Sequence, residues 1–83
     1  MFGRGKDRVE GTARLVSYTE TRDRGEFEAI IQAKVIIAAE GIEATEVESY
    51  VAVPVTKLPA DPGTVWKVSL DRKKPWDWKL AED

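Results

Sequence analysis

The sequence predicts an all-β fold: a single small domain with five strands that form a barrel or a strongly curled antiparallel meander. Apolar side chains recur at every second position through most of the chain, which is the period of a half-buried strand. Gly and Pro residues fall between these alternating runs, where turns and loops need them. The 83 residues allow one domain, with an ordered core expected over residues 9–80.

The composition excludes several kinds of site. The chain has no Cys and no His, which removes disulfides, thiolate metal sites and the commonest general base and metal ligand. We therefore expect no catalytic residue, no cofactor-binding residue and no metal ligand, and a protein that is not an enzyme. The net charge is −2, with an acidic middle and weakly basic ends. This is not the strong single-sign field that indicates a nucleic acid or an anionic membrane as partner.

The sequence shows neither the pattern of a signal peptide nor that of a membrane-spanning helix. The start of the chain is charged and lacks the apolar stretch of a signal peptide. The longest apolar segment, residues 29–39, is interrupted by Gln32 and Lys34 and is too short to span a bilayer. We expect a cytoplasmic protein without membrane insertion, frayed at residues 1–7 and 81–83.

The first strand is predicted over residues 9–19. Its alternation places four small or apolar residues on one face: Val9, Gly11, Ala13 and Leu15. Gly11 within the run indicates a bulge or a close approach of another backbone. The polar residues 21–26 would form the hairpin loop to the second strand.

Residues 27–39 carry an ambiguous pattern. Every odd position, 27 included, is apolar, which favours a long strand with Ile31, Val35 and Ile37 buried. A helix with Gly41 as its C-cap stays an alternative, although Ile37 would lie outside its apolar stripe.

The second half of the chain continues the alternation. Glu40 and Gly41 would form a two-residue turn into a third strand over residues 42–55, with a bulge or bend between Ile42 and Val47. A proline-rich loop follows over residues 58–63.

Two further strands complete the prediction, with the strands mostly in hairpin order. Residues 65–72 form one strand, and its inward residues are Trp66, Val68 and Leu70. Residues 76–80 form the last strand, which places Trp76, Trp78 and Leu80 on one face, so that the last two tryptophans cap the core.

Several of these elements occur together in a known group of domains. They are Gly11-Thr12-Ala13, then Pro62-Gly63 leading into a strand that ends at Asp71, then Pro75 before the last strand. In this arrangement the chain resembles small uncharacterised β domains of bacteria, especially actinobacteria, over most of residues 9–80. Those domains often carry Asp-Pro where this chain has Asp71-Arg72, and many lie beside transmembrane helices, which this sequence lacks. The resemblance implies an all-β fold and brings no activity.

The end of the chain holds the sharpest candidate for a binding surface. It combines basic and aromatic side chains: Arg72, Lys73, Lys74, Trp76, Trp78 and Lys79. Small barrels bind single-stranded nucleic acid with such mixtures, by stacking bases and neutralising phosphates. The alternative, that the tryptophans pack in the core and the lysines are solvated, is favoured, because so small a domain needs its aromatic rings for packing.

Other charged and nucleophilic residues fit a solvated surface better than a binding or catalytic site. Arg22, Asp23 and Arg24 could hold a phosphate at a hairpin tip, and four glutamates could suggest a hard-cation site: Glu40, Glu43, Glu46 and Glu48. The glutamate spacing does not match a calcium loop. The serines have no histidine to activate them: Ser17, Ser49 and Ser69.

We therefore expect a non-enzymatic accessory or protein-interaction module, about the size of an OB or SH3 domain, that binds a protein partner or itself. The alternative is a weak single-strand nucleic-acid binder of OB type. A salt-dependent interaction with a single-stranded oligonucleotide would distinguish the second function from the first.

Overall fold

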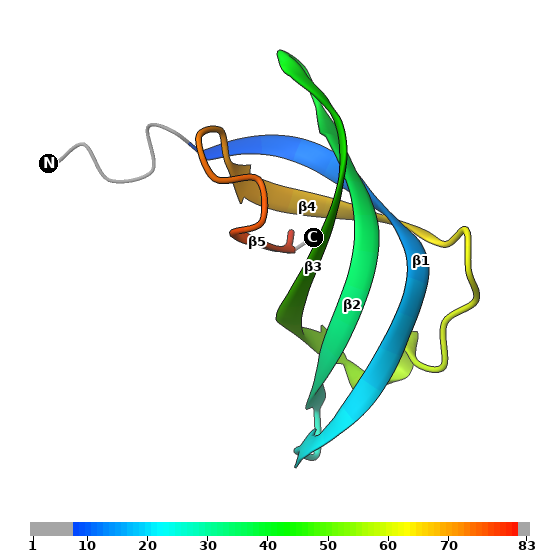
Figure 1. The fold of residues 1–83 in the computed structure, drawn as a ribbon. Helices are drawn as coiled ribbons and strands as arrows, with labels where there is room; N and C mark the ends of the chain where they lie inside the picture. Colours follow the sequence, from blue (N-terminus) through cyan, green and yellow to red (C-terminus); the bar gives the residue numbers. More distant parts are fainter. Residues whose placement is uncertain (1–7, 82–83) are drawn as a thin grey trace, which may run out of the picture.

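The computed structural model describes residues 8–81 and contains five antiparallel strands in one sheet (Figure 1). They are β1 (Arg8–Arg24), β2 (Glu28–Ala39), β3 (Ile42–Pro54), β4 (Val65–Asp71) and β5 (Trp78–Leu80), with a short 3₁₀ helix, η1 (Val55–Lys57), between β3 and β4. The all-β prediction is confirmed, and residues 28–39 form a strand rather than a helix. The fraying expected at residues 1–7 and at Glu82 and Asp83 lies outside the described residues.

The strand order is β3-β2-β1-β4-β5, so the chain is not a simple meander. Strands β1 to β3 follow one another as hairpins, but β4 pairs with β1 instead of β3. The connection after η1 carries the chain back to the free edge of β1. There the Leu15 N–H donates to Thr64 O at 2.8 Å, and the Gly63 N–H donates to Leu15 O at 2.7 Å. These bonds hold the start of β4 beside β1. The strand order therefore differs from the hairpin order expected for this part of the chain.

One face of the sheet holds the core. Its buried residues come from all five strands: Ala13, Leu15, Ala29, Ile31, Ala33, Val35, Ile37, Val51, Val53, Trp66, Val68, Leu70 and Trp78. A sheet must cover its apolar face with another layer or with itself. In residues 8–81 no α-helix supplies that layer, and the strands bend strongly around the core instead (Figure 1). The predicted burial of Ile31, Val35 and Ile37 is confirmed.

The curled sheet is not closed. Strands β3 and β5 lie at the two ends of the strand order and share no backbone ladder, so the predicted barrel is not confirmed. Strand β5 has three residues, which limits the ladder that it can form. The two ends nevertheless lie close together, because side-chain hydrogen bonds from Ser49 in β3 reach the chain around β5.

The backbone conformation of Gly41 and the close packing at Gly11 agree with the prediction. Gly41 has a φ of 80° in the two-residue turn between β2 and β3, a conformation that glycine adopts without strain. Gly11 lies so close to the next strand that a Cβ atom would overlap Ala38 O and approach Leu70 Cδ2 to 3.0 Å. The bend expected after Ile42 is also present. The β2–β3 register shifts between Ile37 and Ala39, and Ala39 is the residue of β2 that pairs with Ile42.

The ends of β1 and β2 on either side of their connecting loop differ from the prediction. Strand β1 runs to Arg24, because the β1–β2 ladder continues past its register shifts to the pair Arg24 and Ala29. The expected loop over residues 21–26 is therefore shorter. Phe27 precedes β2 and is 76% exposed rather than buried. Its carbonyl accepts a hydrogen bond from Val55 N–H, which holds the backbone while the ring faces solvent.

Candidate binding surface

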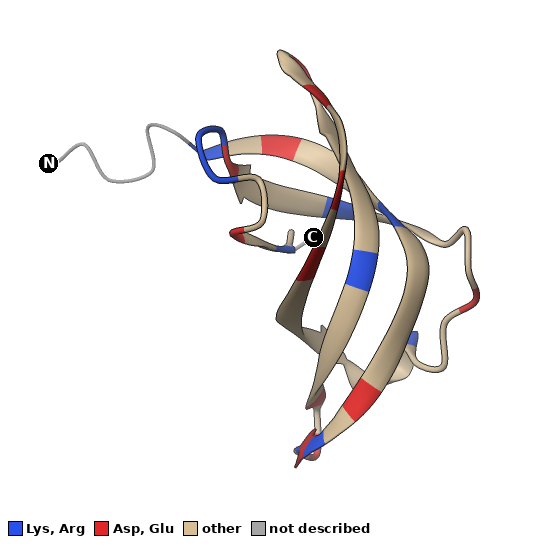
Figure 2. Ribbon diagram, in the orientation of Figure 1, with Lys and Arg blue, Asp and Glu red and all other residues tan. Residues whose placement is uncertain are grey.

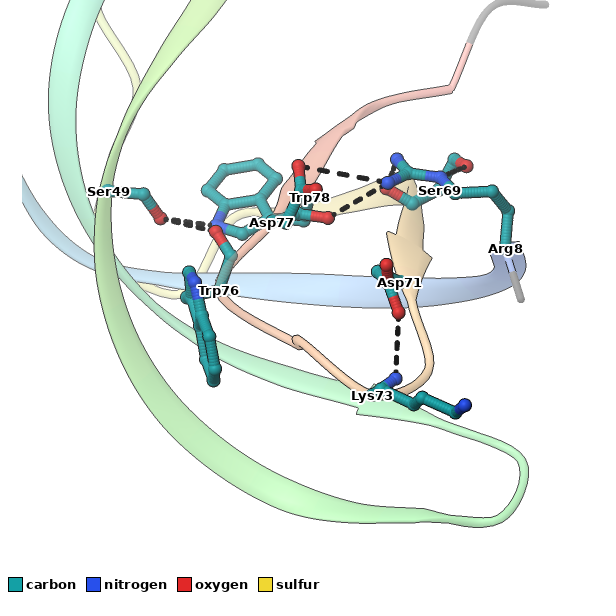
Figure 3. Close-up of polar contacts among 8 residues, drawn as sticks. All are labelled: Arg8, Ser49, Ser69, Asp71, Lys73, Trp76, Asp77 and Trp78. Carbon is teal, nitrogen blue, oxygen red and sulfur yellow. Dashed lines mark hydrogen bonds and ion pairs between the residues drawn. The ribbon is translucent and has the colours of Figure 1, made fainter. Parts of the chain in front are cut away.

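The loop between β4 and β5, residues 72–77, is folded into two successive turns (Figure 3). The Lys73 N–H donates to Asp71 Oδ1 at 2.8 Å, and the Lys74 N–H donates to Asp71 O at 3.1 Å. The Asp77 N–H then donates to Lys74 O at 2.8 Å, and the Asp71 N–H donates to Asp77 O at 3.2 Å. These bonds hold the loop in a defined conformation that the short hairpin alone would not impose.

Arg8, at the start of β1, attaches the loop to the sheet (Figure 3). Its guanidinium donates from Nε to Ser69 Oγ at 3.2 Å and from the second terminal nitrogen to Ser69 O at 2.9 Å. The first terminal nitrogen donates to Asp77 O at 3.1 Å and lies 3.8 Å from Asp77 Oδ1. The sequence pattern did not indicate this role, because Arg8 is separated from both partners by most of the chain.

Ser49 of β3 holds the other side of the loop. Its hydroxyl donates to Trp76 O at 3.2 Å and accepts a hydrogen bond from Trp78 Nε1 at 2.8 Å. Trp78 is buried, with 4% of its surface exposed. A buried indole N–H needs a partner, and Ser49 supplies it. The packing interpretation is therefore confirmed for Trp78.

Trp76 has the opposite environment. It precedes β5, lies within the second turn of the loop and is 57% exposed, whereas Trp66 is 6% exposed. The prediction that Trp76 shares a strand face with Trp78 and Leu80 is wrong. The turn that includes Asp77 interrupts the alternation, so the indole of Trp76 does not follow Trp78 into the core.

The basic residues of the loop precede this exposed ring in sequence. Arg72, Lys73 and Lys74 are exposed, and none of them forms an ion pair within residues 8–81. Figure 2 shows their segment as a basic turn at one end of the sheet. The structure thus brings four of the six predicted residues into one loop, which we call the basic loop: Arg72, Lys73, Lys74 and Trp76.

The remaining two predicted residues lie elsewhere. Trp78 is in the core, and Lys79 lies on β5 beside an open hollow of about 380 Å³. That hollow is also lined by Lys57 from η1 and by Leu80. The pairing of Lys79 with Ser69 in the β4–β5 ladder places it on the strand and away from the turns.

The other candidates show surface roles. Arg24 is an exposed residue whose guanidinium lies 2.9 Å from Glu20 Oε1, so its charge is partly compensated. Glu46 and Glu48 follow one face of β3, opposite Ile36 and Lys34 in the register. Residues 8–81 contain no group of three acidic residues placed to hold a metal ion.

Comparisons with known proteins do not assign the chain to a family. No protein-family model matches it, and neither a curated protein nor a solved structure matches it. The resemblance to small bacterial β domains therefore stays a prediction. In the part of the chain that the structure describes, no helix is long and apolar enough to cross a membrane.

Proposed function

We propose that this domain is a non-enzymatic interaction module and that the basic loop contacts a partner protein. The observation that carries the proposal is the division of the tryptophans: Trp66 and Trp78 are in the core, while Trp76 is 57% exposed. An exposed indole leaves apolar surface in water, and burying that surface would favour association. Tryptophan and arginine are also the residue types most enriched among interface hot spots, and the loop carries both as Trp76 and Arg72.

The hydrogen bonds of the loop support a binding role. A flexible loop loses conformational entropy when a partner orders it, which reduces affinity. Here Asp71, Arg8 and Ser49 already hold the backbone of residues 72–77. The indole of Trp76 can therefore be presented to a partner without the cost of ordering the loop.

The charge of the loop indicates the chemistry of the partner. Three exposed cations lie within five residues, and the nearby Asp77 carboxylate faces Arg8. Such a surface favours a partner patch with Asp or Glu side chains, because complementary potentials steer association and set specificity.

Single-stranded nucleic acid is the second candidate, and the same exposed ring beside three cations favours it. A five-stranded sheet with its ends close together also fits the partly open OB architecture, in which strands 2 and 3 contribute to the binding face. In this protein, however, the β2–β3 surface carries the exposed carboxylates of Glu28, Glu46 and Glu48. Carboxylates repel phosphates, so the acidic protein partner is the preferred proposal.

Two labelled probes of equal length test this function: an oligoglutamate peptide and an oligothymidylate. We expect the peptide to bind more tightly, with an affinity that falls as salt rises. The double variant Lys73→Glu/Lys74→Glu should lose the binding. The matched control Arg22→Glu/Lys57→Glu changes the net charge equally at exposed positions outside the loop, and it should retain binding. Tighter binding of the oligothymidylate would establish the nucleic-acid function instead, and binding of neither probe would refute both.

A further inference from the structure

Strand β3 has a free edge that the proposed function does not use. It lies at one end of the strand order, so within residues 8–81 no strand pairs with the side of β3 that faces away from β2. The hydrogen bonds from the β5 side reach β3 at Ser49. Residues 42–48 precede that point and belong to the hairpin that projects from the sheet (Figure 1).

The backbone of this edge can pair with another strand. In an antiparallel ladder, alternate residues direct their N–H and C=O groups away from the strand already paired. Residues 42–48 therefore offer donors and acceptors to a chain that approaches from the open side, apart from the Glu43 carbonyl, which accepts a hydrogen bond from Thr45 Oγ1 at 2.8 Å. The register shift falls between Ile42 and Thr45, so a short extended segment would pair regularly along residues 45–48, a length within the usual range for strands.

The side chains along the edge indicate what would pair there. Glu46 and Glu48 are exposed on the outer face, and neither forms an ion pair among the described residues. On β2, Glu46 lies opposite the apolar Ile36, and Glu48 lies opposite the cation Lys34. On the inner face, the half-buried Val47 packs against the core. An added strand would meet carboxylates on one face and an apolar surface on the other.

We propose that the edge at residues 42–48 binds an extended segment of a partner protein in which Lys or Arg alternates with β-branched apolar residues. Directly opposed side chains on neighbouring strands have Cβ atoms about 4.5–5.5 Å apart. The cations of the segment would face Glu46 and Glu48, and its apolar residues would extend the core beyond Val47. Backbone hydrogen bonds would supply affinity and the alternating side chains would supply specificity, as in other cases of strand addition.

In the register centred on Val47, a second copy of this chain fits the edge poorly. A two-fold antiparallel pairing centred on Val47 would place Glu46 of each copy opposite Glu48 of the other. Like charges directly opposite each other destabilise a sheet. In this register the charge pattern favours a basic partner segment over self-association through β3. This inference does not depend on the basic loop.

The experiment titrates the protein with a labelled peptide in which lysine alternates with valine. A second peptide has the same sequence and charge, with alternate backbone nitrogens methylated along the edge that would pair. We expect the first peptide to bind and to shift the backbone amide resonances of residues 42–48. Methylation should abolish binding, because it removes the ladder donors and keeps the charges.

Variants test the role of the carboxylates. Glu46→Lys/Glu48→Lys should weaken peptide binding about tenfold or more, since two attractive cross-strand pairs become repulsive. Glu26→Lys/Glu28→Lys has the same charge change at exposed positions near the β1–β2 turn and should bind as the unaltered protein does. Equal binding of the methylated peptide, equal loss in both variants, or a dimer of the protein held through β3 would overturn the proposal. None of these results bears on the basic loop, whose binding is measured with the acidic peptide.

Discussion

The Trp78 indole N–H donates to Ser49 Oγ at 2.8 Å, and this bond joins the two ends of a sheet that share no backbone ladder (Figure 3). The same hydroxyl donates to Trp76 O at 3.2 Å. One serine therefore satisfies a buried ring and also holds the backbone of the exposed one. The core and the basic loop meet at this residue.

Replacing Ser49 by alanine should destabilise the fold. The Trp78 N–H would lose its partner in a buried position, which costs about 1–3 kcal/mol. Denaturant unfolding measures the change in the free energy of unfolding. Ser17→Ala, at an exposed position of β1, is the matched control and should change stability by less than about 0.5 kcal/mol. Equal stability of the two variants would show that the Ser49 hydroxyl does not hold the ends of the sheet together.

Removing the ring of Trp78 should have a larger effect. Substitution of a buried Trp by Ala costs about 3–5 kcal/mol, from lost transfer energy and the cavity left behind. Small domains have about 5–15 kcal/mol of stability in total, so Trp78→Ala should be largely unfolded or melt far below the original protein. Circular dichroism during heating provides the measurement. A melting temperature close to the original would contradict the burial of Trp78.

Gly11 tests the close approach of strands on both sides of β1. In Gly11→Ala, the new methyl group would overlap Ala38 O and crowd Ala39 Cβ and Leu70 Cδ2, at 2.9 and 3.0 Å. Overpacking of this kind costs about 1–3 kcal/mol. Gly25→Ala is the control, because the new atom would lie 3.4 Å from Glu28 O, which is ordinary van der Waals contact. An unchanged unfolding midpoint in both variants would contradict the close approach of the strands at Gly11.

Gly41 tests the β2–β3 turn. Its φ of 80° is strained for a β-branched residue, so Gly41→Val should destabilise by about 1–3 kcal/mol. Gly41→Asn should cost less, because asparagine adopts this conformation more readily. Apart from the residue itself and its two chain neighbours, no atom of residues 8–81 would lie within 4 Å of the new Cβ, so a difference between the two variants reports on the backbone and not on a clash. Equal stability of the two variants would contradict the positive φ of Gly41 in the β2–β3 turn.

Local features of the fold were predictable from the sequence. The alternation of residues 27–39 predicted β2, and the glycine at position 41 predicted the turn into β3, because both signals depend on neighbouring residues. The place of β4 was not predictable in this way. It depends on hydrogen bonds between Leu15 and the distant residues Gly63 and Thr64, which leave no periodic pattern in the sequence.

Only part of the binding surface was predictable, because some of it depends on contacts between residues that are distant in the sequence. The cluster of basic and aromatic residues was visible in the sequence, but Trp76 and Trp78 have the spacing of residues on one strand face. Backbone bonds from Asp77 to Lys74 and from Asp71 to Asp77 interrupt that strand before β5 begins. The roles of Arg8 and Ser49 depend on contacts between distant parts of the chain.

The most direct test of the central claim, that Trp76 serves binding while Trp78 serves the fold, is a paired measurement on Trp76→Ala. The variant is unfolded with denaturant and, in parallel, titrated with the oligoglutamate peptide. We predict a free energy of unfolding within about 0.5 kcal/mol of the original protein, as for other exposed positions. We also predict a loss of peptide affinity of at least about fivefold, the effect of removing one contact worth about 1 kcal/mol. A large loss of stability, or a stable variant that binds the peptide as tightly as before, would contradict the claim.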